Sequence, residues 1–321
     1  MIRVYRSLDA IGPEARNATV CIGNFDGVHE GHRALLRRNL EISRQMGTTP
    51  SVLTFDPHPT TVVAPHRAPK LLTTVEQRAV LLHREGIEQL FVLPFDRGFS
   101  ELRPDQFVRT VLVDAIGARA VLVGDNFRFG HGQAGDIETL RALGEQFGFR
   151  TEVVHGVRLR GRFVSSSAVR ESIESGAVST ACRLLGRPYS VEGAVVGGFG
   201  IGRKQTVPTL NLDTPAEVLP VRGVYITRTE DLDAPERQWP SITNVGLRPT
   251  FGGDRLTIET YLLGPLEGET PMRIRLDFLR RVREERKFDS PAELKAQILR
   301  DVSRAQAYFR RTSRVPSEPA C

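Results

Sequence analysis

The chain has 321 residues, of which 40% are hydrophobic and 26% are charged, and its formal net charge is +6. This length favours two domains, and the composition is typical of a globular protein with a solvated surface. The positive charge is spread along the chain, no apolar run approaches the ~20 residues that span a membrane, and no signal-peptide core is evident. We therefore expect a cytoplasmic monomer or weak homo-oligomer with no nucleic-acid partner and no membrane partner.

The first half of the chain alternates between strand-like and helix-like segments. The strand-like runs occupy residues 20–23, 51–55, 90–93, 120–123 and 151–154. The helix-like stretches lie near residues 31–46, 74–85, 105–116 and 136–147. This alternation predicts an α/β domain, over residues 1–182, with a mainly parallel sheet that is covered on both faces. Ligands bind beyond the carboxyl ends of such strands.

The segment VCIGNFDGVHEGH, residues 20–32, combines a buried strand, a glycine-rich turn and two histidines three positions apart. A strand that leads through such a turn into a helix is a common phosphate site, because free amides and the helix dipole both attract anions. His29 and His32 alone are also compatible with packing or with zinc ligation, although further zinc ligands are not evident nearby. The candidate phosphate-binding residues of the turn are Gly23, Asn24, Phe25 and Gly31.

Further polar segments follow in the same half. DPHP, residues 56–59, comes after the second strand, and GDNFRFG, residues 124–130, places Arg128 between two phenylalanines. VSSSAVR, residues 164–170, places three hydroxyl groups at a helix start and an arginine one turn later, at Ser165, Ser166, Ser167 and Arg170. Taken alone, these residues fit loop packing, a surface ion pair and helix capping. Beside the histidine turn, the serine segment indicates a second clamp on a triphosphate.

The second half has a different pattern. After a linker at residues 183–190, short strand-like runs are separated by turns rich in Gly, Pro and Asp. They occupy residues 191–196, 206–212, 223–229, 241–245, 256–263 and 272–279. This spacing predicts a small antiparallel barrel or sandwich. A final helix begins with the capping box Ser290-Pro291-Ala292-Glu293 and continues to about Arg310, so we expect a domain over residues 191–310 and a disordered tail over 311–321.

Three features of this half indicate a phosphate and metal site. GGFGIGRK, residues 197–204, is glycine-rich and cationic, although such glycines are often simple turns or bulges. Its candidate phosphate-binding residues are Gly198, Gly202, Arg203 and Lys204. Thr209 and Asn211 share one face of a strand, and their oxygens suit Mg²⁺. Glu259 is either an exposed edge carboxylate or a base that accepts the proton of a substrate alcohol.

The motifs of the first half, in this order and spacing, resemble the N-terminal module of bacterial bifunctional riboflavin kinase/FMN adenylyltransferases, also called FAD synthetases. The resemblance implies a Rossmann-like nucleotidyltransferase domain in which FMN attacks the α-phosphate of ATP, giving FAD and pyrophosphate. It implies that His29 and His32 are catalytic, and that Asn126 and Arg128 lie in the flavin-binding loop. It also implies that the serine segment closes on the phosphates; Ser167 stands where many relatives have threonine.

The second half is similar to the riboflavin kinase module of the same family, a small β-barrel with a C-terminal helix. PTLN, residues 208–211, matches its P-T-A-N motif except at Leu210. GVY, residues 223–225, and NVGLRPTF, residues 244–251, match two further motifs. Relatives usually have histidine in place of Gly197 and Leu-Gly-Phe in place of residues 205–207, so we expect the ATP flap to differ in mobility or affinity.

The kinase resemblance also implies roles for single residues. Thr209 and Asn211 would hold Mg²⁺ with ATP, and the 197–204 loop would cover the phosphates. Glu259 would be the catalytic base that activates the ribityl 5′-hydroxyl, and Arg283 would lie in the flavin site.

The two resemblances together predict a bifunctional enzyme that converts riboflavin to FMN and FMN to FAD with ATP. One alternative keeps the fold but loses one activity through the altered kinase loop. Another is a flavin- or nucleotide-binding regulator without turnover. The catalytic candidates His29, His32 and Glu259 favour an enzyme, because a protein that only binds its ligand does not need a base.

Overall fold

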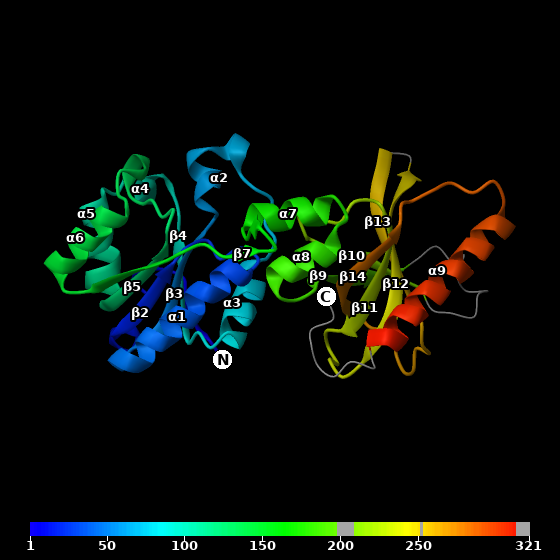
Figure 1. Cartoon of the computed structure of the whole chain (residues 1–321), viewed down its shortest axis with the longest axis horizontal. Helices are drawn as coiled ribbons and strands as arrows, with labels where there is room; N and C mark the ends of the chain where they lie inside the picture. Colours follow the sequence, from blue (N-terminus) through cyan, green and yellow to red (C-terminus); the bar gives the residue numbers. More distant parts are fainter. Residues whose placement is uncertain (198–208, 251–252, 313–321) are drawn as a thin grey trace. The chain divides into compact units, whose positions relative to one another are not determined.

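The structure of the protein, a computed structural model, describes residues 1–197, 209–250 and 253–312 (Figure 1). It divides into two compact units, Met1–Ser166 and Ser167–Cys321. Most of the predicted phosphate loop of the second half, including Gly198, Gly202, Arg203 and Lys204, lies outside the described residues.

A six-stranded parallel sheet forms the centre of the first unit. In spatial order its strands are β1 (Arg3–Tyr5), β4 (Gln89–Pro94), β3 (Thr49–Asp56), β2 (Ala18–Ile22), β5 (Ala118–Gly124) and β6 (Arg150–Val154). Five of them confirm predicted strands, whereas the three-residue β1 was not predicted. β2 is buried along its whole length. Its carboxyl end, where the histidine turn begins, therefore lies in the middle of the sheet edge at which such folds bind ligands.

Helices cover both faces of this sheet (Figure 1). On one face lie α1 (Glu30–Met46) and α3 (Val75–Arg84); on the other lie α5 (Pro104–Phe107), the π-helical η3 (Val108–Ala115) and α6 (Ile137–Phe147). The predicted helix over 105–116 is thus an α-helical turn that continues as a π-helix. The shorter elements are η1 (Pro13–Ala15), α2 (Pro59–Val63), η2 (Pro65–Arg67), α4 (Arg97–Ser100), η4 (His131–Gln133) and the hairpin of β7 (Arg158–Leu159) and β8 (Arg162–Phe163).

Asn39 fixes α1 on the sheet. Its side chain is completely buried, and Nδ2 donates to the carbonyl oxygens of Thr19 on β2 (2.9 Å) and Ser51 on β3 (3.1 Å). Oδ1 accepts from the Ser43 hydroxyl at 3.2 Å. Buried polar groups are stable only when they are hydrogen-bonded, so this amide sets the position of α1 along two strands and hence the place where its first turn begins.

The second unit contains a closed antiparallel barrel. Around the barrel the strands are β10 (Thr209–Asp213), β13 (Gly253–Leu262), β12 (Gln238–Thr250), β11 (Gly223–Asp231), β14 (Arg273–Arg283) and β9 (Tyr189–Val196), which pairs with β10. This confirms the predicted barrel and excludes the sandwich. The final helix, α9 (Pro291–Thr312), starts with proline as predicted, and the Ser290 hydroxyl accepts from the Glu293 N–H at 3.2 Å. It ends two residues after Arg310, and residues 313–321 lie outside the described range.

Two further helices, α7 (Ser166–Glu174) and α8 (Val178–Leu185), precede the barrel. α8 contacts β14 and β9, and the Ser179 hydroxyl donates to the Leu279 carbonyl at 3.0 Å. By contacts, therefore, the two helices belong mainly with the barrel, whereas the sequence suggested a domain end at residue 182. The boundary between the functional modules stays a prediction. Within the three described ranges, no helix is long and apolar enough to cross a membrane.

α9 covers the outer surface of the barrel (Figure 1). Ala305 of α9 packs with buried apolar side chains of β11, β12 and β14, namely Val224, Ile226, Ile242 and Leu279. The opposite face of β11 and β12, together with β13, carries a network of fully buried hydroxyl groups, formed by Thr227, Thr229, Ser241, Thr243 and Thr260. The barrel thus has a partly polar interior in which the hydroxyl groups satisfy one another.

We expect Asn39→Ala to lower the free energy of unfolding of the first unit by about 2 kcal/mol, because the Thr19 and Ser51 carbonyls lose a buried donor. Hydrogen–deuterium exchange of the β2 amides measures this change. Arg44→Ala, at an exposed position of the same helix, is the control and should leave exchange unchanged. Equal protection in Asn39→Ala and the natural protein would contradict the role given to the amide.

Candidate active sites

The turn between β2 and α1 has an unusual backbone. Phe25 and Val28 adopt positive φ angles of 49° and 40°, and Gly27 between them has φ 80°. Positive φ is costly for bulky and β-branched residues and persists only where surrounding contacts enforce it. Phe25 and Val28 are buried, with 0% and 2% exposure, so packing holds the turn in this shape.

Asp26 anchors the turn to the segment before α3. Its carboxylate accepts hydrogen bonds from the Leu72 N–H (2.9 Å) and from the Thr73 N–H and hydroxyl (both 3.1 Å). The Gly27 N–H donates to the same threonine hydroxyl at 3.1 Å. Asp26 is 1% exposed. The carboxylate is therefore a buried structural group that fixes the turn to the segment before α3.

His29 is the N-cap of α1. Its Nδ1 accepts a hydrogen bond from the His32 backbone N–H at 3.3 Å. A neutral imidazole accepts at one nitrogen and donates at the other, so this bond assigns the proton of His29 to Nε2. The rings of His29 and His32 stack, with centroids 3.7 Å apart and an angle of 12° between planes. The cap therefore orients both imidazoles at the helix N-terminus, where the dipole favours anions.

The His32 side chain is buried and lies near the charge of Arg78. Its Nδ1 is buried and has no hydrogen-bond partner within the described residues. Burial, which disfavours the charged ring, lowers the pKa of His32 well below its usual range, and two further causes are the repulsion that His29 and His32 would exert if both were protonated and the charge of Arg78. Arg78 is itself 4% exposed and donates to the Thr54 hydroxyl at 3.2 Å. His32 is therefore neutral at physiological pH.

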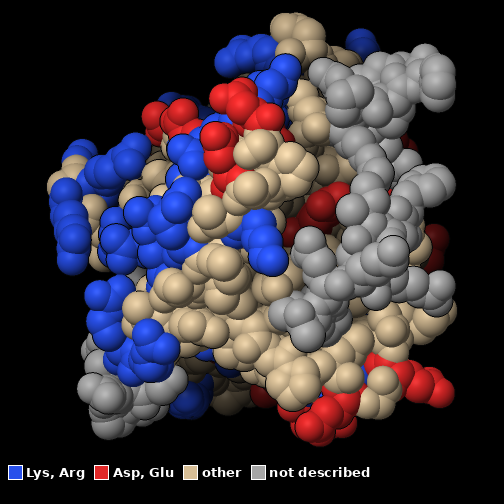
Figure 2. All heavy atoms as spheres, turned by 90° about the vertical axis from the view of Figure 1, so that its right-hand side faces the viewer, with Lys and Arg blue, Asp and Glu red and all other residues tan. Residues whose placement is uncertain are grey.

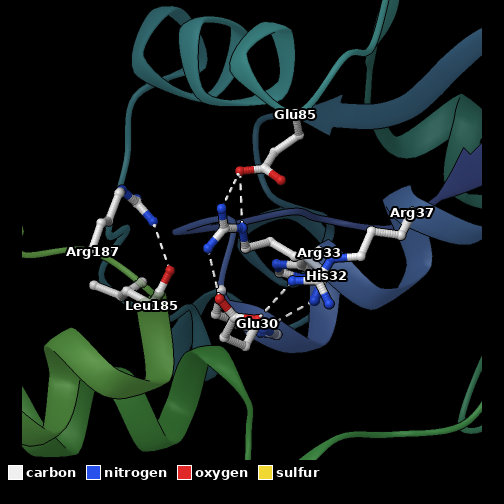
Figure 3. A network of polar contacts seen from close by, with 8 residues as sticks. Glu30, His32, Arg33, Arg37, Glu85, Leu185 and Arg187 are labelled. Carbon is white, nitrogen blue, oxygen red and sulfur yellow. Dashed lines mark hydrogen bonds and ion pairs between the residues drawn. The ribbon is translucent and has the colours of Figure 1, made fainter. Parts of the chain in front are cut away.

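A network of ion pairs supports the first turn of α1 (Figure 3). Arg33 contacts Glu30 at 2.7 Å and, across to the end of α3, Glu85 at 2.8 Å. Arg37 contacts the second oxygen of Glu30 at 3.2 Å. Because Glu30 and Arg33 directly follow the two histidines, the network holds the helical turn that carries them.

The structure brings the start of the serine segment to the histidine turn. The Ser166 hydroxyl donates to the Asp26 carbonyl at 2.9 Å. A Cβ at Gly31 would lie 3.1 Å from the His29 ring and 3.3 Å from the Val164 carbonyl oxygen, so a larger residue here would press on the imidazole and on the segment before α7. The predicted residues Gly23, Asn24, Phe25, Gly31, His29, His32, Ser165 and Ser166 all belong to the first unit, whereas Ser167 and Arg170 belong to the second.

The other two predicted loops lie at the same sheet edge. Asn24 contacts Nε2 of His58, in the DPHP segment after β3, at 2.8 Å. After β5, Asn126 and Arg128 are exposed, and Arg128 forms an ion pair with Asp136 at 3.5 Å. The neighbouring ring of Phe129 is buried and stacks on Phe127 at 5.4 Å. The phenylalanines thus anchor a loop that presents polar side chains to solvent.

In the barrel, strand register brings Asn211 and Glu259 together. Asn211 of β10 pairs directly with Glu259 of β13, which also pairs with Asn244 of β12. Side chains of directly paired residues lie about 4.5–5.5 Å apart at Cβ. Thr209 lies two positions before Asn211 and therefore on the same face. One hydroxyl, two amides and one carboxylate thus share a face of three neighbouring strands.

Arg283 ends β14 and is held by α9. Its Nε donates to the Asp301 carboxylate at 2.8 Å, and Nη1 donates to the Glu284 carbonyl at 2.9 Å. The guanidinium also lies 5.7 Å from the centre of the Phe288 ring. Arg283 is therefore a fixed cation rather than a mobile surface side chain.

Several residues of these sites were not singled out from the sequence. His58 and Arg78 support the first site, and Asn244 flanks Glu259 in the second. The sequence places DPHP after the second strand, but the partner of His58 depends on which strands are neighbours. It places Asn244 within a motif without a partner, because a two-residue period assigns a face and not a register. Arg78 gave no signal in the sequence.

Comparison with known proteins agrees with this division into two sites. A family model described as FAD synthetase matches residues 12–168, and one described as riboflavin kinase matches residues 185–309. The chain is 35% identical over 307 residues to the bifunctional riboflavin kinase/FMN adenylyltransferase of Pseudomonas fluorescens, covering 95% of this chain and 97% of that protein. It is 36% identical over 288 residues to the protein of the same name from Escherichia coli K12, covering 90% and 91%.

A solved structure has the same overall fold. The crystal structure of a protein from Streptococcus pneumoniae named as a macrolide-efflux protein matches with a TM-score of 0.84 and 27% identity, covering 94% of this chain and 98% of that chain. Its name refers to a different activity from that of the curated relatives, and the similarity concerns the arrangement of the chain.

The low pKa of His32 predicts a pH-dependent stability of the first unit. Because the folded-state pKa lies below the unfolded-state value of about 6.5, the unfolded chain binds more protons as the pH falls. The free energy of unfolding is therefore highest above about pH 6.5. It falls below that pH, by at most about 1.4 kcal/mol per pH unit. Hydrogen exchange of β2 and α1 between pH 7.5 and 5.5 measures the slope. His32→Gln should reduce it, and an unchanged slope would refute the assignment.

Proposed function

The chain belongs to the family of bifunctional riboflavin kinase/FMN adenylyltransferases, and on this basis we propose which of its two sites carries out which reaction. The family's activities are the ATP-dependent phosphorylation of riboflavin to FMN and the adenylylation of FMN to FAD. We assign adenylyl transfer to the histidine turn and riboflavin phosphorylation to the Asn211–Glu259 face. The cytoplasmic location, the absence of a nucleic-acid partner and the monomeric or weakly oligomeric state expected from the sequence stay part of the proposal.

In adenylyl transfer, a phosphate oxygen of FMN attacks the α-phosphorus of ATP. The bond between the α-phosphorus and the oxygen that bridges it to the β-phosphorus breaks, and pyrophosphate leaves. The FMN phosphate is already ionised near neutral pH, so the reaction needs no strong base. The remaining task is to align two anions and to stabilise the charge that gathers on the equatorial oxygens. A helix N-terminus with neutral hydrogen-bond donors suits this task.

His29 is the better-defined donor. Its Nδ1 is occupied by the His32 amide, so Nε2–H is the group that can donate to a phosphate oxygen. Stacking fixes the second imidazole beside it. We assign both histidines to transition-state stabilisation, with Ser165 and Ser166 at the neighbouring end of the segment that contacts the turn. The resemblance assigns Ser167 and Arg170 to phosphate binding as well, and we assign Asn126 and Arg128 to the flavin.

In the kinase reaction, Glu259 accepts the proton of the ribityl 5′-hydroxyl while that oxygen forms a bond to the γ-phosphorus of ATP, and ADP leaves. The pairing of Glu259 with Asn211 and Asn244 supports this role, because it places the carboxylate beside two amides that can orient substrates. Arg283 contributes to flavin binding in the same site.

The donor atoms of Thr209 and Asn211 fit Mg²⁺, since hydroxyl and amide oxygens are hard ligands and this ion keeps several waters or phosphate oxygens in its shell. When bound there with ATP, the ion would neutralise phosphate charge and leave Glu259 to handle the proton.

One observation carries the proposal: the central pair of each site lies within a single compact unit, His29 with His32 in one and Asn211 with Glu259 in the other. Two independent sites predict that the reactions can be lost separately.

His29→Asn tests the first site. Asparagine is a good N-cap, so this change keeps α1 capped while it removes the imidazole donor. We expect FAD formation from supplied FMN to fall about 100- to 1000-fold and riboflavin phosphorylation to persist. Chromatographic assay of both half-reactions gives the result. His83→Asn makes the same change at an exposed position of α3 and serves as the control. Normal FAD formation by His29→Asn would remove the histidine from the chemistry.

Glu259→Gln tests the second site by removing the base with little change of shape. We expect FMN formation from riboflavin to fall about 100- to 10,000-fold, with adenylylation of supplied FMN unchanged. Glu267→Gln, on an exposed loop, is the matched control. Parallel loss of both reactions would count against independent sites.

A further inference from the structure

Two polar side chains on the barrel-facing side of α9 are unusually buried. Gln297 is 6% exposed and Asp301 is 2% exposed, and with Ala305 they form one stripe at intervals of four residues. Such a stripe is normally apolar on a helix that covers a barrel. A buried carboxylate is tolerated only where a cation and hydrogen bonds compensate for its lost hydration.

The compensation comes from the end of β14, from the segment that follows it and from α9 itself. Asp301 Oδ2 accepts from Arg283 Nε at 2.8 Å, and Oδ1 accepts from Gln297 Nε2 at 2.8 Å. Gln297 Oε1 in turn accepts from Arg286 Nη2 at 2.8 Å and from Arg300 Nη2 at 2.8 Å. Both carboxylate oxygens and the amide oxygen are thus used.

This network differs from ordinary surface charge. Figure 2 shows the face that lies at the right of Figure 1, where basic side chains cover much of one side and acidic ones form separate groups. Exposed charges of this kind contribute little to structure. The pair of Arg283 and Asp301 is instead 18% and 3% exposed at its side chains, so losing one member leaves the other buried without compensation.

The network leaves one nitrogen of Arg283, Nη2, without a partner among the described residues. Nε is bound to Asp301 and Nη1 to the Glu284 carbonyl, and the Phe288 ring lies 5.7 Å from the guanidinium carbon. A guanidinium that is held at two of its nitrogens and keeps free donors on the third is suited to binding a polar acceptor.

The segment directly after β14, residues 284–286, touches the strand beside Glu259. A Cβ at Gly246 of β12 would overlap with the Glu285 carboxylate and lie 3.0 Å from Asn244 Nδ2. Asn244 pairs directly with Glu259. The segment that Asp301 and Gln297 hold is therefore packed on the strand next to the proposed base.

We infer that Asp301 is a positioning residue of the riboflavin kinase site, with Gln297 as its support. Asp301 holds Arg283 so that Nη2 meets a polar acceptor of the flavin, and the inference rests on the proposed function only in that Arg283 binds flavin. In Asp301→Asn the amide nitrogen faces either Gln297 Nε2 or Arg283 Nε, both of which are donors, so one of the two bonds is lost. The charge on Arg283 then also lacks its counter-ion.

The test uses the full-length protein and both half-reactions. We expect Asp301→Asn to raise the KM for riboflavin about tenfold or more, with a smaller change in kcat and with adenylylation of supplied FMN unchanged. Asp301→Glu, which keeps the charge, should recover part of the affinity. Asp233→Asn makes the same chemical change on an exposed loop and is the matched control. An unchanged riboflavin KM in Asp301→Asn, or an equal loss of both half-reactions, would overturn the inference.

A double-mutant cycle with Arg283→Met shows whether Asp301 acts through the arginine. If it does, Asp301→Asn adds little to the KM change in the Arg283→Met background; additive effects would overturn the inference. If Arg283→Met leaves riboflavin binding unchanged, the flavin role of Arg283 in the proposed function fails instead.

Fluorescence of Trp239, the single tryptophan, reports whether the barrel is folded. Should Asp301→Asn not fold, Gln297→Met keeps the ion pair but removes its support, and an unchanged riboflavin KM there would equally refute the inference.

Discussion

The hydrogen bond from the His32 amide to Nδ1 of His29 joins the fold of the first unit to the chemistry proposed for it. It caps α1, and it assigns the proton of His29 to the nitrogen that can donate to a phosphate. Everything around it preserves this arrangement: Asp26 fixes the turn from below, and Asn39 fixes the helix along two strands. A helix that began one residue earlier or later would turn both imidazoles away from the sheet edge.

Buried polar groups have a similar role in both units. Asp26 in the first unit and Asp301 in the second are almost completely buried, and each accepts hydrogen bonds from chain segments distant in sequence. An apolar side chain would fill either position, but it would not fix the direction of its neighbours. The cost of an unsatisfied buried carboxylate makes these contacts specific, because few alternative arrangements supply all the donors.

The two units bring their candidate site residues together in different ways. In the parallel sheet, successive strands end at one edge, so loops after β2, β3 and β5 gather there without long connections. In the barrel, antiparallel register places single side chains opposite one another, as with Asn211 and Glu259. The first arrangement suits several loops around two anions; the second suits a base held beside a hydroxyl and amides. A bifunctional flavin enzyme uses both.

The sequence by itself determined the alternation that gives the sheet, the strand spacing that gives the barrel, and the motifs that identify the family. These follow from local periodicity and from glycine, proline and histidine at fixed positions. Only the tertiary structure decided that Asn244 flanks Glu259, that the charge of Arg78 acts on His32, and that Asp301 holds Arg283. The physical reason is that register and burial depend on residues far apart in the chain, and no local pattern records which distant donor will satisfy a buried polar group.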